Sequence, residues 1–159
     1  MDLVEPSAFR VEKYRAHAVV RLTTGAAVMG HFFLANASPT SSGRERVAEL
    51  LNSESGFFPF EDQNGQTVLY NRDHVVCVEV SDDEASRDSG YGVATTRRVS
   101  VVLSNGLYIQ GTVRVYRPEG RDRLSDWARH DQRFRYIETA HATFIINADH
   151  IVYATEATS

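Results

Sequence analysis

Two Asp-His pairs are the residues of this chain whose types and spacing could support catalysis. Asp73-His74 and Asp149-His150 each place a carboxylate beside an imidazole, and a carboxylate can orient a histidine as a general base. Neighbouring residues of a strand point to opposite sides, so adjacency alone does not create a catalytic dyad. The chain also has no Gly-x-Ser-x-Gly nucleophile elbow. We therefore favour a structural turn at each pair and keep a hydrolase or metal site at these corners as the alternative.

The spacing of metal-ligand residues gives little support for a metal centre. None of the six histidines stands in a His-x-x-x-His pair, and the single cysteine, Cys77, excludes a cysteine-clustered zinc site. We expect no cofactor and no metal, and we expect Cys77 to be a small buried side chain within Val75–Val80. A site assembled from the distant His74, His141 and His150 is the alternative.

Arginines interleaved with aromatic residues mark the last third of the chain. Such a surface can bind single-stranded nucleic acid or an acidic protein, and the alternative is a set of solvated arginines on a helix and on strand edges. The formal net charge of −4, from 17 basic and 21 acidic side chains, provides no general attraction for nucleic acid. The candidate partner-binding residues are Arg114, Tyr116, Arg117, Arg121, Arg129, Arg133 and Arg135.

The composition excludes several classes of protein. No apolar run approaches the roughly 18–20 residues that cross a bilayer, and the first residues lack the pattern of a signal peptide. One cysteine in 159 residues fits a reducing compartment. The sequence therefore predicts a cytoplasmic protein without a membrane partner.

An internal repeat must position all of these residues. Val20–Gly30 recurs as Val101–Gly111, and Tyr70–Val76 recurs as Ile146–Val152. The matching landmarks keep their order, and length differences fall in loop-like stretches, where insertions are tolerated. We therefore expect two copies of one fold.

Each copy has the same pattern of expected elements. A hairpin turns at Gly25 or Gly106, and its second strand contains Gly30 or Gly111, where a missing side chain indicates a bend or the close approach of another backbone. Short helices are expected over 44–52 and 121–130. Strands are expected over 19–22, 27–34, 56–61, 67–71 and 74–80, and over 99–103, 108–115, 134–139, 143–147 and 150–155.

Two further sets of residues have predicted structural roles. Arg46 and Arg123 precede the apolar faces of the helices, and we expect them to bind carbonyls or a carboxylate such as Glu61 or Glu138, attaching helix to sheet. An Asn-x-Asp-His turn connects the last two strands of each copy. Its corner residues are Asn71, Asp73 and His74 in the first copy and Asn147, Asp149 and His150 in the second.

The repeat sets the predicted domain organisation. A unit of about 60 residues buries a marginal core alone, so we expect the two copies to pack as a pseudo-two-fold pair or to oligomerise. The predicted segments are a tail over 1–17, a first repeat over 18–80, a polar linker over 81–98, a second repeat over 99–156 and a tail over 157–159.

The bent five-stranded units, with their hairpin and mid-strand glycines, resemble Sm-like small barrels. Arg46–Asn52, Arg123–Trp127 and the Asn-x-Asp-His endings resemble a group of uncharacterised small bacterial Sm-like β-barrel proteins with the pattern Arg-Leu-x-Asp-Leu-Leu-Asn, Phe, Asn-x-Asp-His-Ile. The resemblance implies a mainly β fold of two tandem Sm-like barrels, each with a short inserted helix. Sm-like proteins commonly bind RNA in rings, but here a helix replaces the RNA-contacting loop.

The functional expectation follows from the open strand edges of such units. Exposed edges can add a strand from another chain, so we predict a non-enzymatic scaffold or interaction module with a protein partner or self-association. The alternative is an RNA-binding or single-stranded nucleic-acid-binding Sm-like regulator. A metal-binding protein or hydrolase at the Asp-His corners is the third hypothesis.

Overall fold

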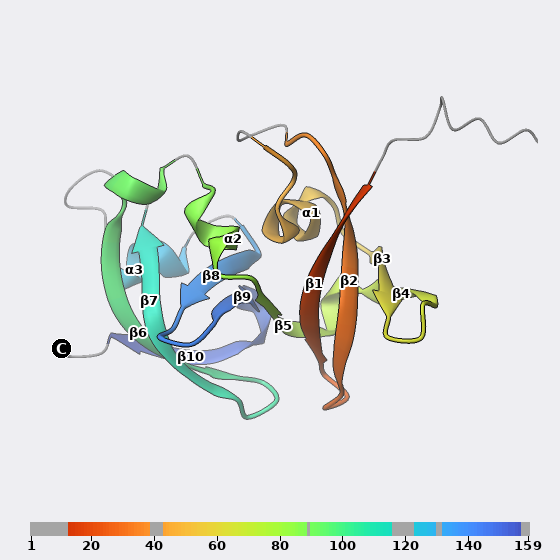
Figure 1. The fold of residues 1–159 in the computed structure, drawn as a ribbon. Helices are drawn as coiled ribbons and strands as arrows, with labels where there is room; N and C mark the ends of the chain where they lie inside the picture. The colour runs from red at the N-terminus through yellow and green to blue at the C-terminus, as the bar shows by residue number, and fades with distance from the viewer. Residues whose placement is uncertain (1–12, 39–42, 89, 116–122, 130–131, 157–159) are drawn as a thin grey trace, which may run out of the picture.

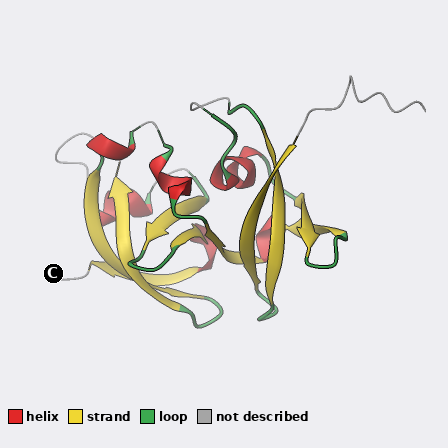
Figure 2. Cartoon of the chain, viewed as in Figure 1, coloured by secondary structure: helices red, strands yellow, loops and turns green. Residues whose placement is uncertain are grey.

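A computed structural model describes residues 13–38, 43–88, 90–115, 123–129 and 132–156, and this part of the chain is mainly β, as expected (Figures 1 and 2). Ten strands form one antiparallel sheet. The strands are β1 (Lys13–Leu22), β2 (Ala27–Ala35), β3 (Phe57–Asp62), β4 (Thr67–Asn71), β5 (Val75–Val80), β6 (Thr95–Leu103), β7 (Tyr108–Val115), β8 (Phe134–Glu138), β9 (Thr143–Asn147) and β10 (Ile151–Glu156). The helices are α1 (Val47–Ser53), α2 (Asp83–Ser86) and α3 (Leu124–Ala128), with 3₁₀ turns η2 (Arg72–His74), η3 (Tyr91–Val93) and η4 (Ala148–His150). No helix in the described ranges is long and apolar enough to cross a membrane.

The order of strands in the sheet repeats once. It runs β10-β6-β7-β8-β9-β5-β1-β2-β3-β4, so each half has its fifth strand first, followed by its first to fourth strands. Figure 1 shows the two halves side by side, with β5 between them. The duplication predicted from the sequence is therefore a duplication of topology. We call β1 to β5 the first repeat and β6 to β10 the second repeat.

The two repeats are joined through β5 and β9, and we call this pairing with its flanking corners the junction. Cys77 lies opposite Ile146, and Val78 lies opposite Ile145. The expected pseudo-two-fold pair is wrong, because β5 and β9 are not equivalent strands and the repeats meet head to tail. The physical reason is that each repeat has two different edges, and the apolar β5 edge of the first repeat buries its side chains against the apolar β9 edge of the second.

The sheet is open: strand pairing does not close either repeat into a barrel. Among the described residues, β10 pairs with β6 and β4 pairs with β3, and neither strand has a second neighbour. The sheet therefore ends in two free edges, which we call the β10 edge and the β4 edge.

Two glycines allow strands to approach closely within each repeat. A Cβ at Gly30 would overlap the carbonyl oxygen of Glu61 on β3, and a Cβ at Gly111 would stand 2.5 Å from the carbonyl oxygen of Glu138 on β8. Real Cβ atoms do not approach a carbonyl this closely. The prediction that these mid-strand glycines mark close backbone approach is confirmed.

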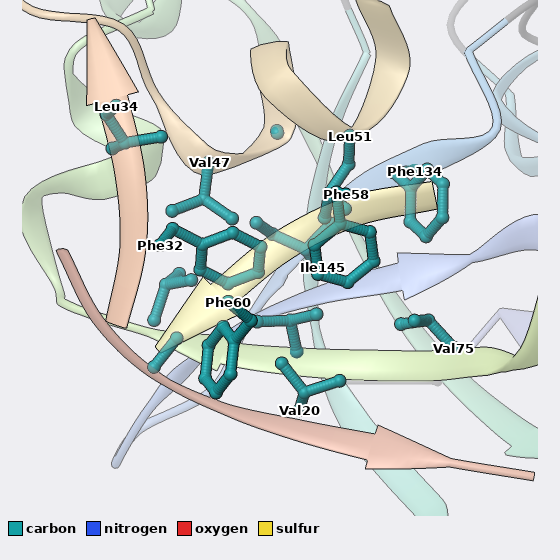
Figure 3. Close-up of a cluster of buried hydrophobic side chains, with 14 residues drawn as sticks. Val20, Phe32, Leu34, Val47, Leu51, Phe58, Phe60, Val75, Phe134 and Ile145 are labelled. Atoms are coloured by element: carbon teal, nitrogen blue, oxygen red, sulfur yellow. The ribbon is translucent and has the colours of Figure 1, made fainter. Parts of the chain in front are cut away.

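Two hydrophobic cores lie along the sheet, and both include residues of the other repeat. The first core contains Phe32, whose ring stacks on Phe58 with centroids 5.4 Å apart. Figure 3 shows that Phe134 and Ile145 of the second repeat belong to this cluster. The second core contains Cys77 from β5 of the first repeat, together with its neighbour Val76. Neither repeat therefore has a core built from its own residues alone.

The helices begin later than the sequence predicts. α1 begins at Val47, because the Glu49 carboxylate accepts the Arg46 backbone N–H at 2.9 Å and caps the first turn there. α3 begins at Leu124 with the same arrangement, in which Asp126 accepts the Arg123 N–H at 2.9 Å. Residues 121, 122 and 130 of the second predicted helix lie outside the described residues.

Two predicted boundaries also differ. β1 begins at Lys13, inside the predicted tail, because its polar first half pairs with the end of β2 from Lys13 opposite Ala35 onward. The segment 81–98 is not an exposed linker throughout. It forms α2 and η3 and then starts β6 at Thr95, and Glu84 and Ala85 are each only 2% exposed.

Candidate functional site

The two Asn-x-Asp-His corners have the same internal geometry. Asn71 Oδ1 accepts the backbone N–H of Asp73 at 2.9 Å, and Asn147 Oδ1 accepts that of Asp149 at 3.0 Å. An asparagine side chain that binds the backbone two residues later stabilises a tight turn.

Each corner histidine binds the first hairpin turn of its own repeat. A hydrogen bond of 2.9 Å joins His74 Nδ1 to Thr23 Oγ1, and one of 2.7 Å joins His150 Nδ1 to Ser104 Oγ. The carboxylate of Asp73 instead binds Arg133 at 2.7 Å. The imidazole and the carboxylate of the Asp-His pair thus have different partners, and the geometry is that of a structural corner.

The second corner also binds the first across the junction. Asn147 is fully buried, and its Nδ2 donates to the carbonyl of Val75 at 2.9 Å and to that of Arg72 at 3.3 Å. His150 Nε2 donates to the carbonyl of Asp73 at 2.8 Å. Because a carbonyl only accepts, these contacts fix the donors, and they add polar specificity to the β5–β9 ladder.

Arg133 connects the two corners electrostatically. Its guanidinium lies 2.7 Å from Asp73 and 2.9 Å from Asp149, and both carboxylates are 67% exposed. Exposed ion pairs contribute about 1 kcal/mol or less, so this bridge orients the corners more than it stabilises the fold.

A buried polar cluster lies where α1, α2 and β8 meet. Arg46 Nη1 donates to Tyr136 Oη at 3.2 Å, and Tyr136 Oη donates to Glu84 Oε2 at 2.9 Å. The same Glu84 oxygen accepts the backbone N–H of Ala48 at 3.2 Å, near the start of α1. The cluster therefore ties the first repeat, the segment between the repeats and the second repeat together.

Burial is the largest influence on the pKa values of the residues in this cluster. It raises the pKa of Glu84, although its hydrogen bonds and nearby arginines offset part of the effect. Burial also raises the pKa of Tyr136 well above its ordinary value. For Arg46, burial alone would lower the pKa, but Tyr136, Asp88 and Glu49 outweigh it and the pKa is raised. Glu84 is 2% exposed, so its carboxyl group depends on these hydrogen bonds in place of water.

Of the two arginines with predicted structural roles, Arg46 binds a carboxylate, although not one of the two named examples, Glu61 and Glu138. Arg46 binds Glu49 at 3.3 Å and Tyr136 at 3.2 Å, whereas Glu61 on β3 pairs with Arg15 on β1. The side chain of Arg123 is exposed. Arg46 thus attaches α1 to the second repeat through Tyr136. Glu138, the other carboxylate named in the prediction, binds Arg114 instead.

A cavity of about 230 Å³ adjoins the polar cluster, between α1, α3 and β8. It is smaller than the roughly 300–1,000 Å³ of ordinary ligand sites. Arg114 on its wall binds Glu138 at 2.8 Å, and Arg135 donates to the Trp127 carbonyl at 2.7 Å. Two of the charged side chains around the cavity, Arg114 and Glu138, thus bind each other.

Four of the seven predicted partner-binding residues lie within the described residues, and two of them, Arg114 and Arg135, line the cavity. Arg114, Arg133 and Arg135 bind different parts of the chain, as described above, and Arg129 is exposed at the end of α3. Tyr116, Arg117 and Arg121 lie outside the described residues.

Metal ligands and the cysteine are also dispersed. The described residues contain no group of three or more histidine, cysteine, aspartate or glutamate side chains that could hold a metal ion. Cys77 is fully buried, and burial raises the pKa of its thiol to about 12.

The β10 edge exposes apolar side chains whose counterparts in the first repeat are buried. Val152 is 64% exposed and Tyr153 is 54% exposed. Their counterparts Val76 and Cys77 on β5 are 0% exposed and belong to the second hydrophobic core.

The β4 edge shows the same contrast. Leu69 is 63% exposed, whereas its counterpart Ile145 on β9 is 0% exposed and belongs to the first hydrophobic core. The neighbouring Phe57 on β3 is 59% exposed, and its counterpart Phe134 is 1% exposed. Sequence reasoning missed these residues, because nothing local distinguishes a strand covered by another repeat from one at the end of a sheet.

Comparisons with protein-family models, with curated proteins and with solved structures find no significant match to this chain.

Proposed function

We propose that the protein is a non-enzymatic interaction module that binds polypeptide strands at the β4 edge and the β10 edge. One observation carries this proposal. Leu69, Val152 and Tyr153 are exposed at the two ends of the sheet, whereas their repeat counterparts on β9 and β5, the strands of the junction, are fully buried.

The chemistry of an open edge supports the proposal. An edge strand presents unpaired N–H and C=O groups, and an added strand gains main-chain hydrogen bonds from these groups and specificity from side chains. Soluble proteins commonly protect such edges with charged residues or proline. β4 reads Thr-Val-Leu-Tyr-Asn and has neither. Burying one large apolar side chain contributes about 1.5–3 kcal/mol, so a covering strand would gain substantially from Leu69.

We also propose that each repeat is an Sm-like unit with an inserted helix. The support is the order fifth-first-second-third-fourth strand in both repeats, the glycine within each second strand and the tight corner before each fifth strand.

Peptide binding tests strand addition directly. A labelled peptide with the β9 sequence Thr143–Asn147 and short flanks is titrated with the full chain in dilute solution, and fluorescence anisotropy reports binding. We expect binding that Tyr153→Lys abolishes and Leu69→Lys preserves. A peptide with the β5 sequence Val75–Val80 should show the reverse dependence.

A β9 peptide carrying Ile145→Lys is the matched control and should bind weakly. If neither peptide binds, or if neither edge substitution changes binding, the edges do not accept strands and the proposed function is wrong.

A further inference from the structure

We infer that the cavity between the two repeats is a binding site for a small apolar amino acid, held as a zwitterion. Elements of both repeats line it: α1 comes from the first repeat, α3 and β8 come from the second, and Ala85 and Asp88 come from the segment that joins them. Ligand sites occur preferentially at such interfaces. The described lining includes no residue of the β4 edge or the β10 edge, so this inference goes beyond the proposed function and does not depend on it.

Two donors that line the cavity lack an acceptor. Arg46 Nη2 and the indole Nε1 of Trp127 have no hydrogen-bond partner within the described residues, although the other two guanidinium nitrogens of Arg46 do. Arg46 is 8% exposed and Trp127 is 5% exposed, so the cavity is the open space next to both. Neither nitrogen is sealed off, because the fully buried, unpartnered side-chain nitrogens of the described residues belong to other arginines, Arg21, Arg44 and Arg87. A ligand oxygen that accepts from the two donors would satisfy both.

Carboxylates on the cavity wall supply the other half of the site. Asp126 Oδ2 accepts the Arg123 backbone N–H at 2.9 Å, and Asp126 Oδ1 has no hydrogen-bond partner among the described residues. The carboxylate of Asp88 makes long contacts, 3.4 Å to the Gly90 backbone nitrogen and 3.7 Å to Arg46 Nη1. Both carboxylates can therefore accept hydrogen bonds from an ammonium group.

The balance of charge selects a ligand that carries both signs. The described lining contains four carboxylates and three guanidinium groups. A simple anion would meet the excess of negative charge, and a simple cation would leave the donors of Arg46 and Trp127 unpaired. A zwitterion places its carboxylate at these donors and its ammonium group at Asp88 or Asp126. A free α-amino acid carries the two groups on one carbon atom and matches this arrangement.

The size and the apolar part of the wall limit the side chain of the ligand. Liquid water occupies about 30 Å³ per molecule, so a cavity of about 230 Å³ holds about eight non-hydrogen atoms at that density. Valine is a molecule of this size, whereas the aromatic amino acids are larger. Ala48, Val115 and Phe134 provide an apolar wall for its side chain.

Titration of the full chain with L-valine tests the inference, and the single tryptophan of the sequence reports on the site. Because Trp127 lines the cavity, valine should change the tryptophan fluorescence and release or absorb heat with the same Kd, which we expect to be about 1 mM or lower. It should also raise the melting temperature, since it binds the folded state. Heat without a change in fluorescence would place valine outside the cavity and overturn the inference.

Two analogues of valine separate its charged groups. Isovalerate lacks the ammonium group and valinol lacks the carboxylate, and we expect each to bind at least about tenfold more weakly than valine. If isovalerate binds as tightly as valine, the cavity is an anion site and the inference is wrong. If valinol binds as tightly, the donors of Arg46 and Trp127 take no part, and the inference is equally wrong.

Two conservative variants assign the protein groups, with calorimetry for binding and circular dichroism for folding. Asp126→Asn removes the charge but keeps an oxygen for the Arg123 N–H, and it should raise the Kd for valine about tenfold or more. Trp127→Phe keeps an aromatic ring in the wall but lacks the N–H, and it should raise the Kd about two- to tenfold. Arg129→Gln, a change at an exposed residue after the same helix and outside the described lining, is the matched control and should leave the Kd unaltered.

A chain that binds no valine at about ten times the expected Kd, or two folded cavity variants that both bind it as the native chain does, overturns the inference. The β5 and β9 peptides are measured on the same proteins. If they still bind at the two edges, the proposed function stands without the amino-acid site.

Discussion

The helices α1 and α3 occupy equivalent places in the two repeats, yet arginines from different positions hold their C-terminal ends. In the first repeat, Arg72 lies at the corner after β4 and is 2% exposed. Its guanidinium donates to the carbonyls of Leu50, Leu51 and Phe57 at 2.8–2.9 Å. The last carbonyls of a helix have no partner within the helix, so this arginine satisfies groups that would otherwise be buried unpaired.

In the second repeat, Arg135 on β8 performs the same task. It donates to the carbonyl of Trp127 at 2.7 Å, to that of Ala128 at 3.3 Å and to that of Gln132 at 2.6 Å. Trp127 and Ala128 are the repeat counterparts of the α1 residues that Arg72 binds.

The positions of the two arginines are exchanged between the repeats. Ala148 occupies the place of Arg72 in the second repeat, and Phe58 occupies the place of Arg135 in the first. The difference teaches that the fold requires a cation at the C-terminal end of the helix, where the helix dipole and the unpaired carbonyls favour it, and not an arginine at one alignment position.

The largest difference between the repeats should appear in the free energy of unfolding when each of the two arginines is removed. Arg72→Met leaves several buried carbonyls without a donor and should lower the free energy of unfolding by about 3 kcal/mol or more. Arg135 is only partly buried, so Arg135→Met should lower it by about 1–2 kcal/mol. Chemical denaturation monitored by circular dichroism measures both.

The double variant Arg135→Met, Ala148→Arg sharpens this comparison. It moves the second repeat's arginine to the position used by the first and should recover part of the lost stability. Equal losses for Arg72→Met and Arg135→Met would show that the two caps are energetically alike and contradict the distinction drawn from burial.

The mid-strand glycines should also differ between the repeats. Gly30→Ala brings a Cβ into the Glu61 carbonyl and within 2.6 Å of the packed Phe60 ring, and it should destabilise the fold by about 2–3 kcal/mol. Gly111→Ala meets the Cγ2 of Ile137 at 2.9 Å, and we expect a smaller loss of about 1–2 kcal/mol. Gly92→Ala, with open space around it, is the control and should be nearly neutral. A larger loss at Gly111 would reverse the comparison.

The corner histidines provide a smaller difference. His150 binds both Ser104 and the carbonyl of Asp73 across the junction, whereas the imidazole of His74 has Thr23 as its only partner among the described residues. At concentrations where the chain is monomeric, His150→Ala should therefore lower the melting stability by about 1 kcal/mol, and His74→Ala by roughly half as much. If both variants are equally stable, the contact across the junction contributes nothing measurable.

The smallest expected effect is the pH dependence that Glu84 gives to the free energy of unfolding. Glu84 accepts the Ala48 backbone N–H near the start of α1. Its pKa in the fold is raised above 4.5, so the folded state binds this proton more tightly than the unfolded state does. The stability of the native chain relative to Glu84→Gln should therefore fall as the pH rises from 4.5 through the raised pKa, and then level off. Urea unfolding of both proteins across this range measures the difference. If the stability of the native chain relative to Glu84→Gln rises with pH, the pKa of Glu84 is not raised in the folded state.

The sequence was informative wherever spacing along the chain determines the geometry. The glycines at 30 and 111 and the Asn-x-Asp-His corners recur at matched positions, and a turn or a close backbone approach depends on residues near in sequence. These features, the duplication and the mainly β class could therefore be predicted.

The features that were missed depend on contacts between distant segments. Nothing near Arg133 indicates that it bridges Asp73 and Asp149, and Glu84 lies in a polar stretch whose composition resembles a linker. Arg46 reaches Tyr136, 90 residues away. The choice of which edges pair depends on the three-dimensional surfaces of both repeats, so the head-to-tail order was not accessible from periodicity.

The junction also has a consequence for how the chain reaches its native state. Cys77 pairs with Ile146, so the ladder that joins the repeats closes a loop of nearly seventy residues. Closing long loops costs entropy before any contact rewards it, and chains dominated by such pairings fold slowly. We therefore expect β5 and β9 to come together late in folding. Until then, a newly made chain carries four uncovered apolar edges instead of two. Concentrated refolding should trap chains that have paired with each other's repeats, whereas dilute refolding should return the native chain.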